Sequence, residues 1–290
     1  MTEFTFVGDD MRRPRVVSPP QASEFRLWVH NVDRLYAASN FDAELEEILL
    51  VDPDIIVLID VAFSPHVRLA LRDNLKTRWA RGAEISDRHW RNEHPGATDH
   101  GLYVVVREPW QRTVLTDIVD PRGWARFGGV VLQGRGGDSI AVIGVYAPTF
   151  AQCREVDWQR AQAAALPPEE RGTPYELFRQ DLGRAISDLE TRGTPSIVAG
   201  DWNVSWDPRA RLNAMSSAQR RHYEQWKSWF AADEDDPLTS AFAERGHPPT
   251  PTLRRTNASS DIDFVLARRS FYSQTLARAG ILQGVSPEVR

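Results

Sequence analysis

The residues best placed to do chemistry are an aspartate and an asparagine two positions apart, within Gly200-Asp201-Trp202-Asn203-Val204. Residues 196–199, Ser-Ile-Val-Ala, are typical of a short buried strand that ends in a Gly-Asp turn. Side chains two positions apart in an extended segment lie on one side of it. A carboxylate and a carboxamide placed this way suit holding a phosphate beside a divalent cation. The alternative is an Asp/Asn turn that only caps the following segment.

Polar side chains also stand where other predicted strands end, and they could converge at one edge of a sheet. They are Asn31 and Asp33, Asp60, Tyr146, and Asp261 and Asp263, in addition to Asp201 and Asn203. If they converge, Asp60 and Asn31 could hold one hard cation. Asn203 and Tyr146 could then bind a phosphate, and Asp201 could manage a water. Each residue also has a simpler explanation as a turn cap, a core side chain or the partner of an arginine.

Strand-like and helix-like segments alternate along the chain and would position these strand ends. The expected strands are 25–32, 55–59, 102–106, 129–132, 140–146, 196–199 and 262–266. The expected helices run from Phe41 to a stop at Asp52-Pro53, from a capping box at Thr173 and Glu176 to Gly193, and over 223–230. Residues 76–98 are charged and lack a period, which predicts a long surface loop. Residues 1–24 are expected to be a flexible leader before one domain at 25–290.

Composition narrows the class of protein. With 290 residues, 41% hydrophobic and 26% charged, the chain is globular and has enough apolar residues for a substantial core. A net charge of −5 argues against binding nucleic acid through bulk positive charge. A local basic groove is still compatible with this net charge. The single cysteine, Cys153, excludes an internal disulfide and a cysteine-cluster zinc site.

The cysteine count and the lack of long apolar segments also bear on where the protein is located. One cysteine and no N-terminal apolar segment indicate an intracellular protein of the cytoplasm or nucleus, without signal peptide. No apolar run reaches the length of a membrane span, so we expect no membrane partner. We expect a monomer.

In this order the segments resemble the endonuclease/exonuclease/phosphatase superfamily, the Mg²⁺-dependent phosphodiesterase fold of DNase I and exonuclease III. The branch of exonuclease III, apurinic endonucleases and non-LTR retroelement endonucleases is the most similar, with motifs W-N-V-D-G, L-Q-E, Y-x-P, G-D-x-N-V and S-R-x-D-Y. The counterparts here are residues 30–34, 58–60, 146–148, 200–204 and 260–264. The resemblance implies a four-layer α/β (α+β) sandwich, in which two mixed β-sheets pack face to face and are flanked by helices.

The resemblance also implies roles for the site residues. Asn31 and Asp60 would bind Mg²⁺, with Mn²⁺ as a possible substitute. Tyr146 and Asn203 would hold the scissile phosphate, and Asp201 would orient or deprotonate the attacking water. Asp33 would contribute to substrate binding, and Asp263 would orient a catalytic histidine.

Three features depart from the family pattern: two substituted positions and one missing motif. Asp60 stands where the family has Glu, so its carboxylate falls about 1–1.5 Å short unless the backbone shifts. Asp261 stands where the family has Arg and adds negative charge beside a phosphodiester. The closing Ser-Asp-His motif is absent, so the domain is expected to lack its final strand. Asp99-His100 offers a similar sequence, but it stands before an early strand, remote in order from the expected position.

Two functions are compatible with this sequence. The first is a metal-dependent phosphodiester hydrolase, a DNA endonuclease or exonuclease of the retroelement or repair type. The N-V-D and G-D-x-N-V patterns favour this function. The second is a catalytically impaired or truncated relative that binds nucleic acid or a protein. Asp60, Asp261 and the missing histidine favour this second function.

Overall fold

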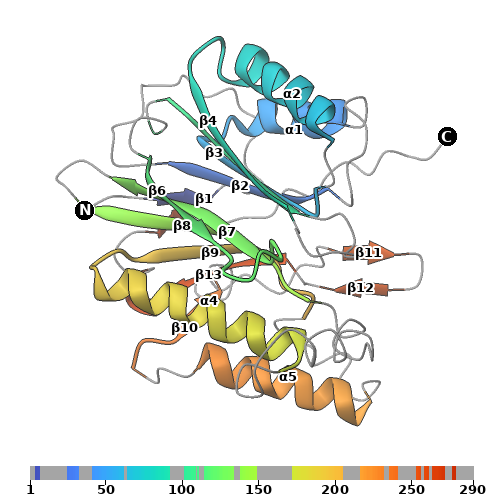
Figure 1. Cartoon of the computed structure of the whole chain (residues 1–290), viewed down its shortest axis with the longest axis vertical. Coiled ribbons are helices and arrows are strands. Elements are labelled where there is room, and N and C mark those ends of the chain that lie inside the picture. The colour runs from blue at the N-terminus through green and yellow to red at the C-terminus, as the bar shows by residue number, and fades with distance from the viewer. Residues whose placement is uncertain are drawn as a thin grey trace.

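Two mixed β-sheets pack face to face, and helices cover the outer face of each sheet (Figure 1). The computed structural model describes residues 4–6, 25–32, 41–61, 64–91, 101–108, 110, 114–133, 138–148, 172–204, 216–231, 235–240, 253–255, 258–260, 263–271 and 276–278. The four-layer α/β sandwich expected from the sequence is confirmed.

The first sheet has the strand order β14-β1-β2-β3-β5-β4. Its strands are β1 (Phe4–Phe6), β2 (Arg26–Asn31), β3 (Ile55–Ile59), β4 (Ile85–Arg91), β5 (Gly101–Arg107) and β14 (Leu276–Arg278). The four strands β14, β1, β2 and β3 run parallel, and β5 is antiparallel to both β3 and β4. Because β2 and β3 are parallel neighbours, their carboxyl ends lie at the same edge of this sheet.

The second sheet has the strand order β10-β13-β9-β8-β7-β6. Its strands are β6 (Val114–Val119), β7 (Phe127–Gln133), β8 (Ser139–Tyr146), β9 (Ser196–Asp201), β10 (Leu238–Ser240) and β13 (Asp263–Arg268). The central pair β8 and β9 is parallel, and all other neighbours are antiparallel. A separate two-stranded ribbon consists of β11 (Leu253–Arg255) and β12 (Ala258–Ser260).

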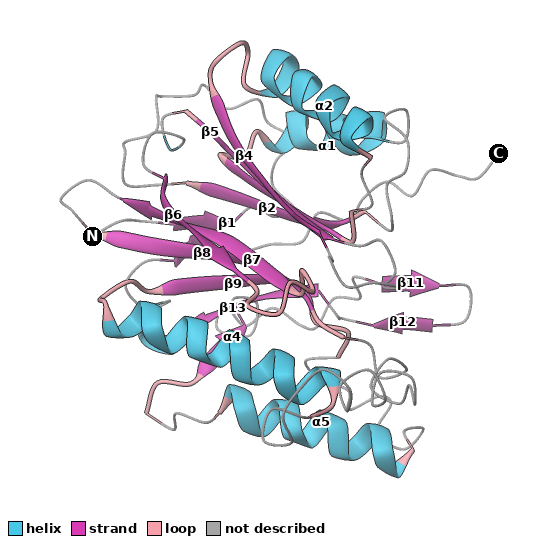
Figure 2. Ribbon diagram, viewed as in Figure 1, coloured by secondary structure: helices cyan, strands magenta, loops and turns pink. Residues whose placement is uncertain are grey.

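Figure 2 shows the helices on opposite sides of the paired sheets. The first sheet is covered by α1 (Phe41–Val51) and α2 (Pro65–Asn74), which continues into a short π-helix, η2 (Leu75–Trp79). The second sheet is covered by α4 (Pro174–Thr191) and α5 (Ser217–Phe230). None of the described helices combines the length and the apolar character that crossing a bilayer requires.

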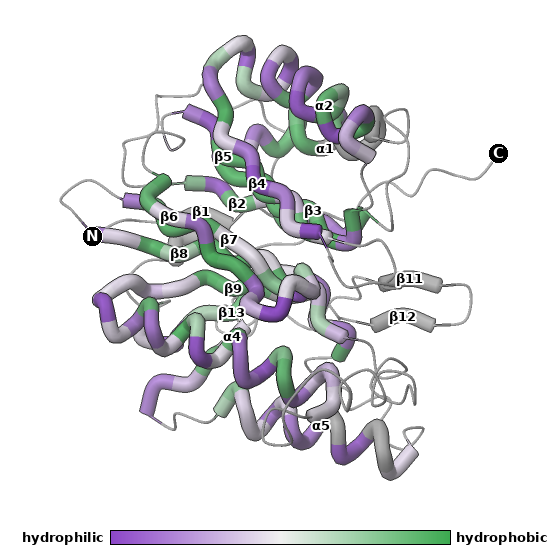
Figure 3. Tube along the Cα trace, viewed as in Figure 1, coloured by the Kyte–Doolittle hydropathy of each residue, from purple (hydrophilic) through white to green (hydrophobic). Residues whose placement is uncertain are grey.

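The apolar residues form three layers that hold these elements together. Between the sheets, one cluster joins side chains such as Val57 of β3 and Val142 of β8. A second cluster packs β7, β8 and β9 against α4 and α5, and a third packs β2, β3 and β5 against α1 and α2. Figure 3 shows hydrophobic residues concentrated in central strands such as β3 and β7, and alternating with hydrophilic ones along the helices. Strands buried on both faces explain the continuous apolar runs in the sequence.

Most elements predicted from the sequence are present, including α1, which ends before Asp52-Pro53, and the capping box of Thr173 and Glu176 at the start of α4. Two predictions are wrong. Residues 76–98 are not one surface loop, because they contain most of η2 and all of β4. The side chains of β4 are mostly half-buried, so its charged residues conceal the alternation of a strand.

The predicted leader is wrong for Phe4–Phe6, which form β1 and pair in parallel with β2 and β14. Three residues are too few for a strand pattern to be recognised in the sequence. No prediction from the sequence covers the strands β6, β10, β11, β12 and β14 or the helix α2.

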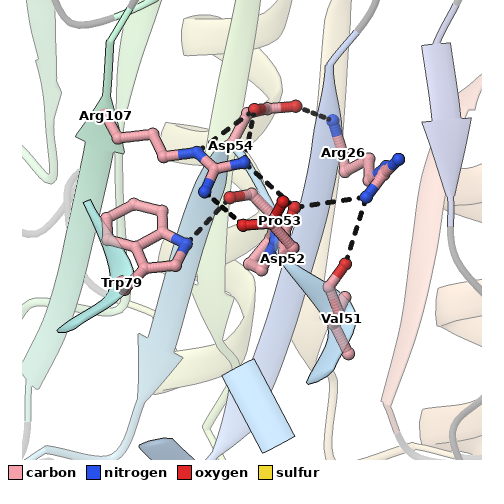
Figure 4. Close-up of polar contacts among 7 residues, drawn as sticks. All are labelled: Arg26, Val51, Asp52, Pro53, Asp54, Trp79 and Arg107. Carbon is pink, nitrogen blue, oxygen red and sulfur yellow. Dashed lines mark hydrogen bonds and ion pairs between the residues drawn. The ribbon is translucent and has the colours of Figure 1, made fainter. Parts of the chain in front are cut away.

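A partly buried ionic cluster lies at the end of the first sheet where β2 and β3 begin (Figure 4). The Arg107 guanidinium contacts the carboxylates of Asp52 and Asp54, and Asp54 also accepts the backbone N–H of Arg26 at 2.9 Å. The Trp79 indole donates to the Pro53 carbonyl at 2.9 Å and lies under the Arg107 guanidinium. This cluster fixes the turn between α1 and β3.

Candidate active site

The strand ends predicted to carry the chemistry meet where the two sheets approach each other. In the first sheet Asn31 of β2 pairs with Ile59 of β3, directly before Asp60. In the second sheet Tyr146 of β8 pairs with Asp201 of β9. Because β2 and β3 are parallel, and β8 and β9 are parallel, each pair places two site residues at one edge of its sheet.

Asp263 joins this edge through its backbone, as the first residue of β13. It pairs with Asp201 in antiparallel register. The structure thus places the backbones of five predicted residues at one edge and adds that of Asn203 two positions further on. Asp33 and Asp261, together with Asp99-His100, lie outside the described residues, as does the side chain of Asp263.

Asp201 is held by one donor from the other sheet and one from its own turn. Its Oδ2 accepts a hydrogen bond from Asn31 Nδ2 at 2.8 Å, across the interface between the sheets. Its Oδ1 accepts the backbone N–H of Asn203 at 2.8 Å. The residue is only 3% exposed, so these two donors fix the plane of a buried carboxylate.

Asn203 closes the turn that follows β9. Its φ is +51°, a left-handed conformation that Asn and Asp adopt more readily than other non-glycine residues. Its Nδ2 donates to the Ala147 carbonyl at 2.8 Å, directly after Tyr146. Asp201 and Asn203 therefore do form the Asp/Asn turn that the sequence offered as an alternative to a chemical role. An amide has two N–H donors, so the second can serve a phosphate oxygen.

Asp60 also has a left-handed backbone, with φ +57°, and is 5% exposed. The backbone on either side is fixed by hydrogen bonds, from Val32 N to the Ile59 carbonyl at 3.0 Å and from Val61 N to the Gly101 carbonyl at 3.1 Å. This departure from the β conformation occurs at the aspartate that is predicted to bind the metal. A residue in this sparsely populated region is maintained by its surroundings, and such residues concentrate at functional sites.

Gly200 lets the two sheets approach at this edge. Its φ is +153°, and a Cβ there would lie 2.1 Å from the Val145 carbonyl oxygen and 2.9 Å from Ile59 Cδ1. Val145 belongs to the neighbouring strand, whereas Ile59 belongs to the other sheet. Glycine is required here because any side chain would separate β9 from both neighbours.

Tyr146 is 9% exposed and belongs to the apolar cluster between the sheets. Its ring lies beneath the guanidinium of Arg126, whose Cζ is 5.3 Å from the ring centroid. No motif in the sequence marks Arg126. The residue stands just before β7, and only the antiparallel pairing of β7 with β8 places it beside Tyr146.

Two histidines lie in the first sheet. His30 precedes Asn31, and its ring contacts that of Trp28 at a centroid distance of 6.0 Å. Successive side chains of a strand alternate between faces, so His30 and Asn31 belong to opposite faces of β2. Burial lowers the pKa of His30, which favours the neutral imidazole. His89 of β4 lies against Tyr103 of β5.

The donors at this edge fit a hard cation. In the part of the chain that the structure describes, no three His, Cys, Asp or Glu side chains group as a complete metal cage. Asn31 at the end of β2 and Asp60 after β3 would supply an amide and a carboxylate oxygen from adjacent strand ends. Mg²⁺ retains several waters and is usually bound through one or two carboxylates and the phosphates of the substrate. An oxygen set this small therefore suits Mg²⁺ or Mn²⁺ better than ions that need a full protein cage.

Two solved structures have a fold similar to that of this chain. The 3′ phosphatase NExo from Neisseria, solved as a variant bound to a product DNA hairpin, has 15% identity and a TM-score of 0.53, over 85% of this chain and 88% of NExo. The 2′,3′-cyclic phosphatase ANGEL2, in complex with adenosine-2′,3′-vanadate, has 11% identity and a TM-score of 0.52, over 83% of each chain. No curated protein matches the sequence.

A family model described as Endonuclease/Exonuclease/phosphatase family matches residues 28–281. The match begins in β2 and extends past β14, so it includes every strand end described above. The chain belongs to the Endonuclease/Exonuclease/phosphatase family.

Proposed function

We propose that this protein is a divalent-metal-dependent phosphodiester hydrolase that cleaves DNA. Membership of the family indicates a phosphodiesterase, phosphatase or nuclease. The observation that carries the proposal is the hydrogen bond from Asn31 to Asp201, which joins a predicted metal ligand of one sheet to the predicted water-handling acid of the other. A turn that served only as a cap would not need a partner from the opposite sheet.

The residues divide the reaction among them. Asn31 and Asp60 would hold Mg²⁺, which when bound offsets negative charge on the phosphate and on the leaving oxygen. Tyr146 and the second amide N–H of Asn203 would hold the scissile phosphate. Asp201, fixed through both of its oxygens, would orient the attacking water and accept its proton.

Two considerations support nucleic acid as the substrate. NExo was solved with a DNA hairpin and ANGEL2 with an adenosine vanadate, and both share the fold of this chain. The Asn31-Val32-Asp33 and Gly200–Val204 motifs resemble those of the DNA-cleaving branch. The choice of DNA, and of the exonuclease III and retroelement branch within the family, depends on these motifs.

A cleavage assay tests the proposal. Purified protein is incubated with plain duplex DNA, abasic duplex DNA, single-stranded RNA and a phosphoinositide, each with Mg²⁺ and with EDTA. We expect Mg²⁺-dependent cleavage of a DNA substrate. Preference for the phosphoinositide or RNA would contradict the DNA assignment. Binding of DNA without any cleavage would favour the impaired, binding-only relative.

The variant Asp201→Asn separates catalysis from turn capping. An amide at 201 can still accept the Asn203 N–H, but its nitrogen would face Asn31 Nδ2, so the Asn31 amide must rotate to offer its oxygen. The variant should fold, lose about 1 kcal/mol of stability and cleave at least ~10²-fold more slowly. Urea unfolding and single-turnover rates measure the two effects, and full activity would show that Asp201 only caps the turn.

A further inference from the structure

A buried arginine lies beside the predicted phosphate-binding edge. Arg126 is 8% exposed, and its guanidinium stacks over the ring of Tyr146. Its backbone carbonyl also accepts the Tyr146 N–H at 2.8 Å, so the two residues are linked through backbone and side chain. Burying a guanidinium is costly, and arginine is seldom so deeply buried unless its surroundings compensate the charge.

The turn that carries Arg126 is built by a second set of polar contacts. Both oxygens of Asp120 accept backbone N–H groups, from Arg122 at 2.9 Å and from Arg126 at 3.0 Å. The Arg122 side chain in turn binds the buried carboxylate of Asp181 on α4. These contacts anchor the turn between β6 and β7 to α4 and thereby hold Arg126 in place.

The negative charge of the aspartates at this edge suggests what the Arg126 guanidinium does. Asp60 and Asp201 are both buried there, and the proposed substrate is a phosphodiester anion. The site therefore needs positive charge that does not depend on the metal alone. A guanidinium stays protonated at every pH of interest, and its planar face packs on an aromatic ring as an ammonium does not.

We propose that Arg126 is a positioning residue for the reaction of this site, which fixes the Tyr146 ring for its contact with the scissile phosphate and places a permanent positive charge beside that phosphate. The inference rests on the proposed function. It adds a residue to the phosphate-binding side of the site that no sequence motif marks.

Two substitutions divide the roles of the stack and the charge. Arg126→Met removes both, and we expect kcat/KM to fall at least tenfold, about 1.4 kcal/mol. Arg126→Lys restores the charge but not the planar stack, so KM should recover while kcat stays low. Arg192→Met removes one exposed arginine after α4, at the opposite end of β9, and should leave both constants unchanged.

A double-mutant cycle with Tyr146→Phe tests whether the two residues act together. If Arg126 positions the Tyr146 ring, Arg126→Met should lower kcat less than about threefold in the Tyr146→Phe background, because the effects of coupled residues are not additive. In protein labelled with 3-fluorotyrosine, the ¹⁹F resonance of Tyr146, identified among six tyrosines by Tyr146→Phe, should shift in Arg126→Met. Urea unfolding confirms that each variant is folded.

The outcomes distinguish the two proposals. If the wild type cleaves no phosphodiester, the proposed function fails. If it cleaves but the losses in kcat from Arg126→Met and Tyr146→Phe multiply, or the ¹⁹F resonance does not move, only the inference about Arg126 is overturned. Coupled losses together with a shifted resonance support it.

Discussion

Single residues at this site combine burial with unusual backbone conformations. Asp60 and Asn203 are two of five non-glycine residues with positive φ among the residues that the structure describes. Both are of the two types that tolerate this conformation best. Asp60 directly follows β3, and Asn203 stands two positions after the end of β9. A strand end held in the left-handed region directs its side chain away from the direction the strand would give it, which suits a ligand or a phosphate contact.

The metal assignment is tested by Asp60→Asn. Asparagine adopts the left-handed conformation as readily as aspartate, so the variant should fold. Loss of one carboxylate from a site with so few protein ligands should weaken Mn²⁺ binding at least tenfold, on the order of 1.4 kcal/mol. Calorimetric titration of Mn²⁺ measures this.

Asp138→Asn is the matched control for that titration. Asp138 is exposed and lies before β8, at the end opposite Tyr146, so the variant removes the same charge away from the site. Mn²⁺ affinity equal in the wild type and Asp60→Asn would remove Asp60 from the metal site.

At the scale of elements, the site depends on two parallel strand pairs whose carboxyl ends face each other across the sandwich. β2 and β3 supply Asn31 and Asp60, whereas β8 and β9 supply Tyr146 and Asp201. Gly200 permits the close approach of β9 to β3, because Ile59 occupies the space where a side chain would lie. The packing of the sheets and the geometry of the site therefore depend on the same glycine.

Gly200→Ala should destabilise the protein by roughly 2–4 kcal/mol, since the methyl group meets backbone as well as Ile59. Gly193→Ala is the control, because Gly193 also has positive φ, +72°, but a Cβ there meets nothing within 4 Å. It should cost only about 1 kcal/mol, the conformational part of the penalty. Urea unfolding measures both, and equal losses would show that the sheets do not need this close approach.

At the scale of the whole molecule, the two ends of β3 have different tasks. Asp60 follows the strand at the site, whereas Asp54 precedes it in the ionic cluster with Arg107. Burial raises the pKa of Asp54, although the Arg107 charge and the Arg26 N–H oppose that rise. Desolvation therefore makes the ionised form of Asp54 less favourable in the folded protein than in the unfolded chain.

The sign of the resulting pH effect follows from proton linkage. Between the ordinary pKa of an aspartate and the raised value, the folded state holds a proton that the unfolded state has lost, so this group's stabilisation decreases as pH rises. The stability advantage of the wild type over Asp54→Asn should be largest at low pH and shrink toward neutral pH.

Urea unfolding across a pH series measures this difference, and Asp138→Asn corrects for the loss of one negative charge. An advantage that grows with pH would contradict the raised pKa of Asp54.

The sequence by itself determined the elements whose signals are local. The run Ile55–Ile59, the capping box of α4 and the spacing of α1 each reflect a preference of consecutive residues, and each is present as predicted. The order of the strand-end motifs determined the family, which the match over residues 28–281 confirms. The metal, the roles of the site residues and the choice of DNA stay predictions.

Only the tertiary structure decided which distant residues touch. The bond between Asn31 and Asp201 joins positions 170 residues apart, and the stack of Arg126 on Tyr146 arises from strand pairing. Strand β4 and the first strand, β1, were missed for the same physical reason. A strand gains its stability from neighbours across the sheet, so a charged or very short strand leaves no local pattern that marks it.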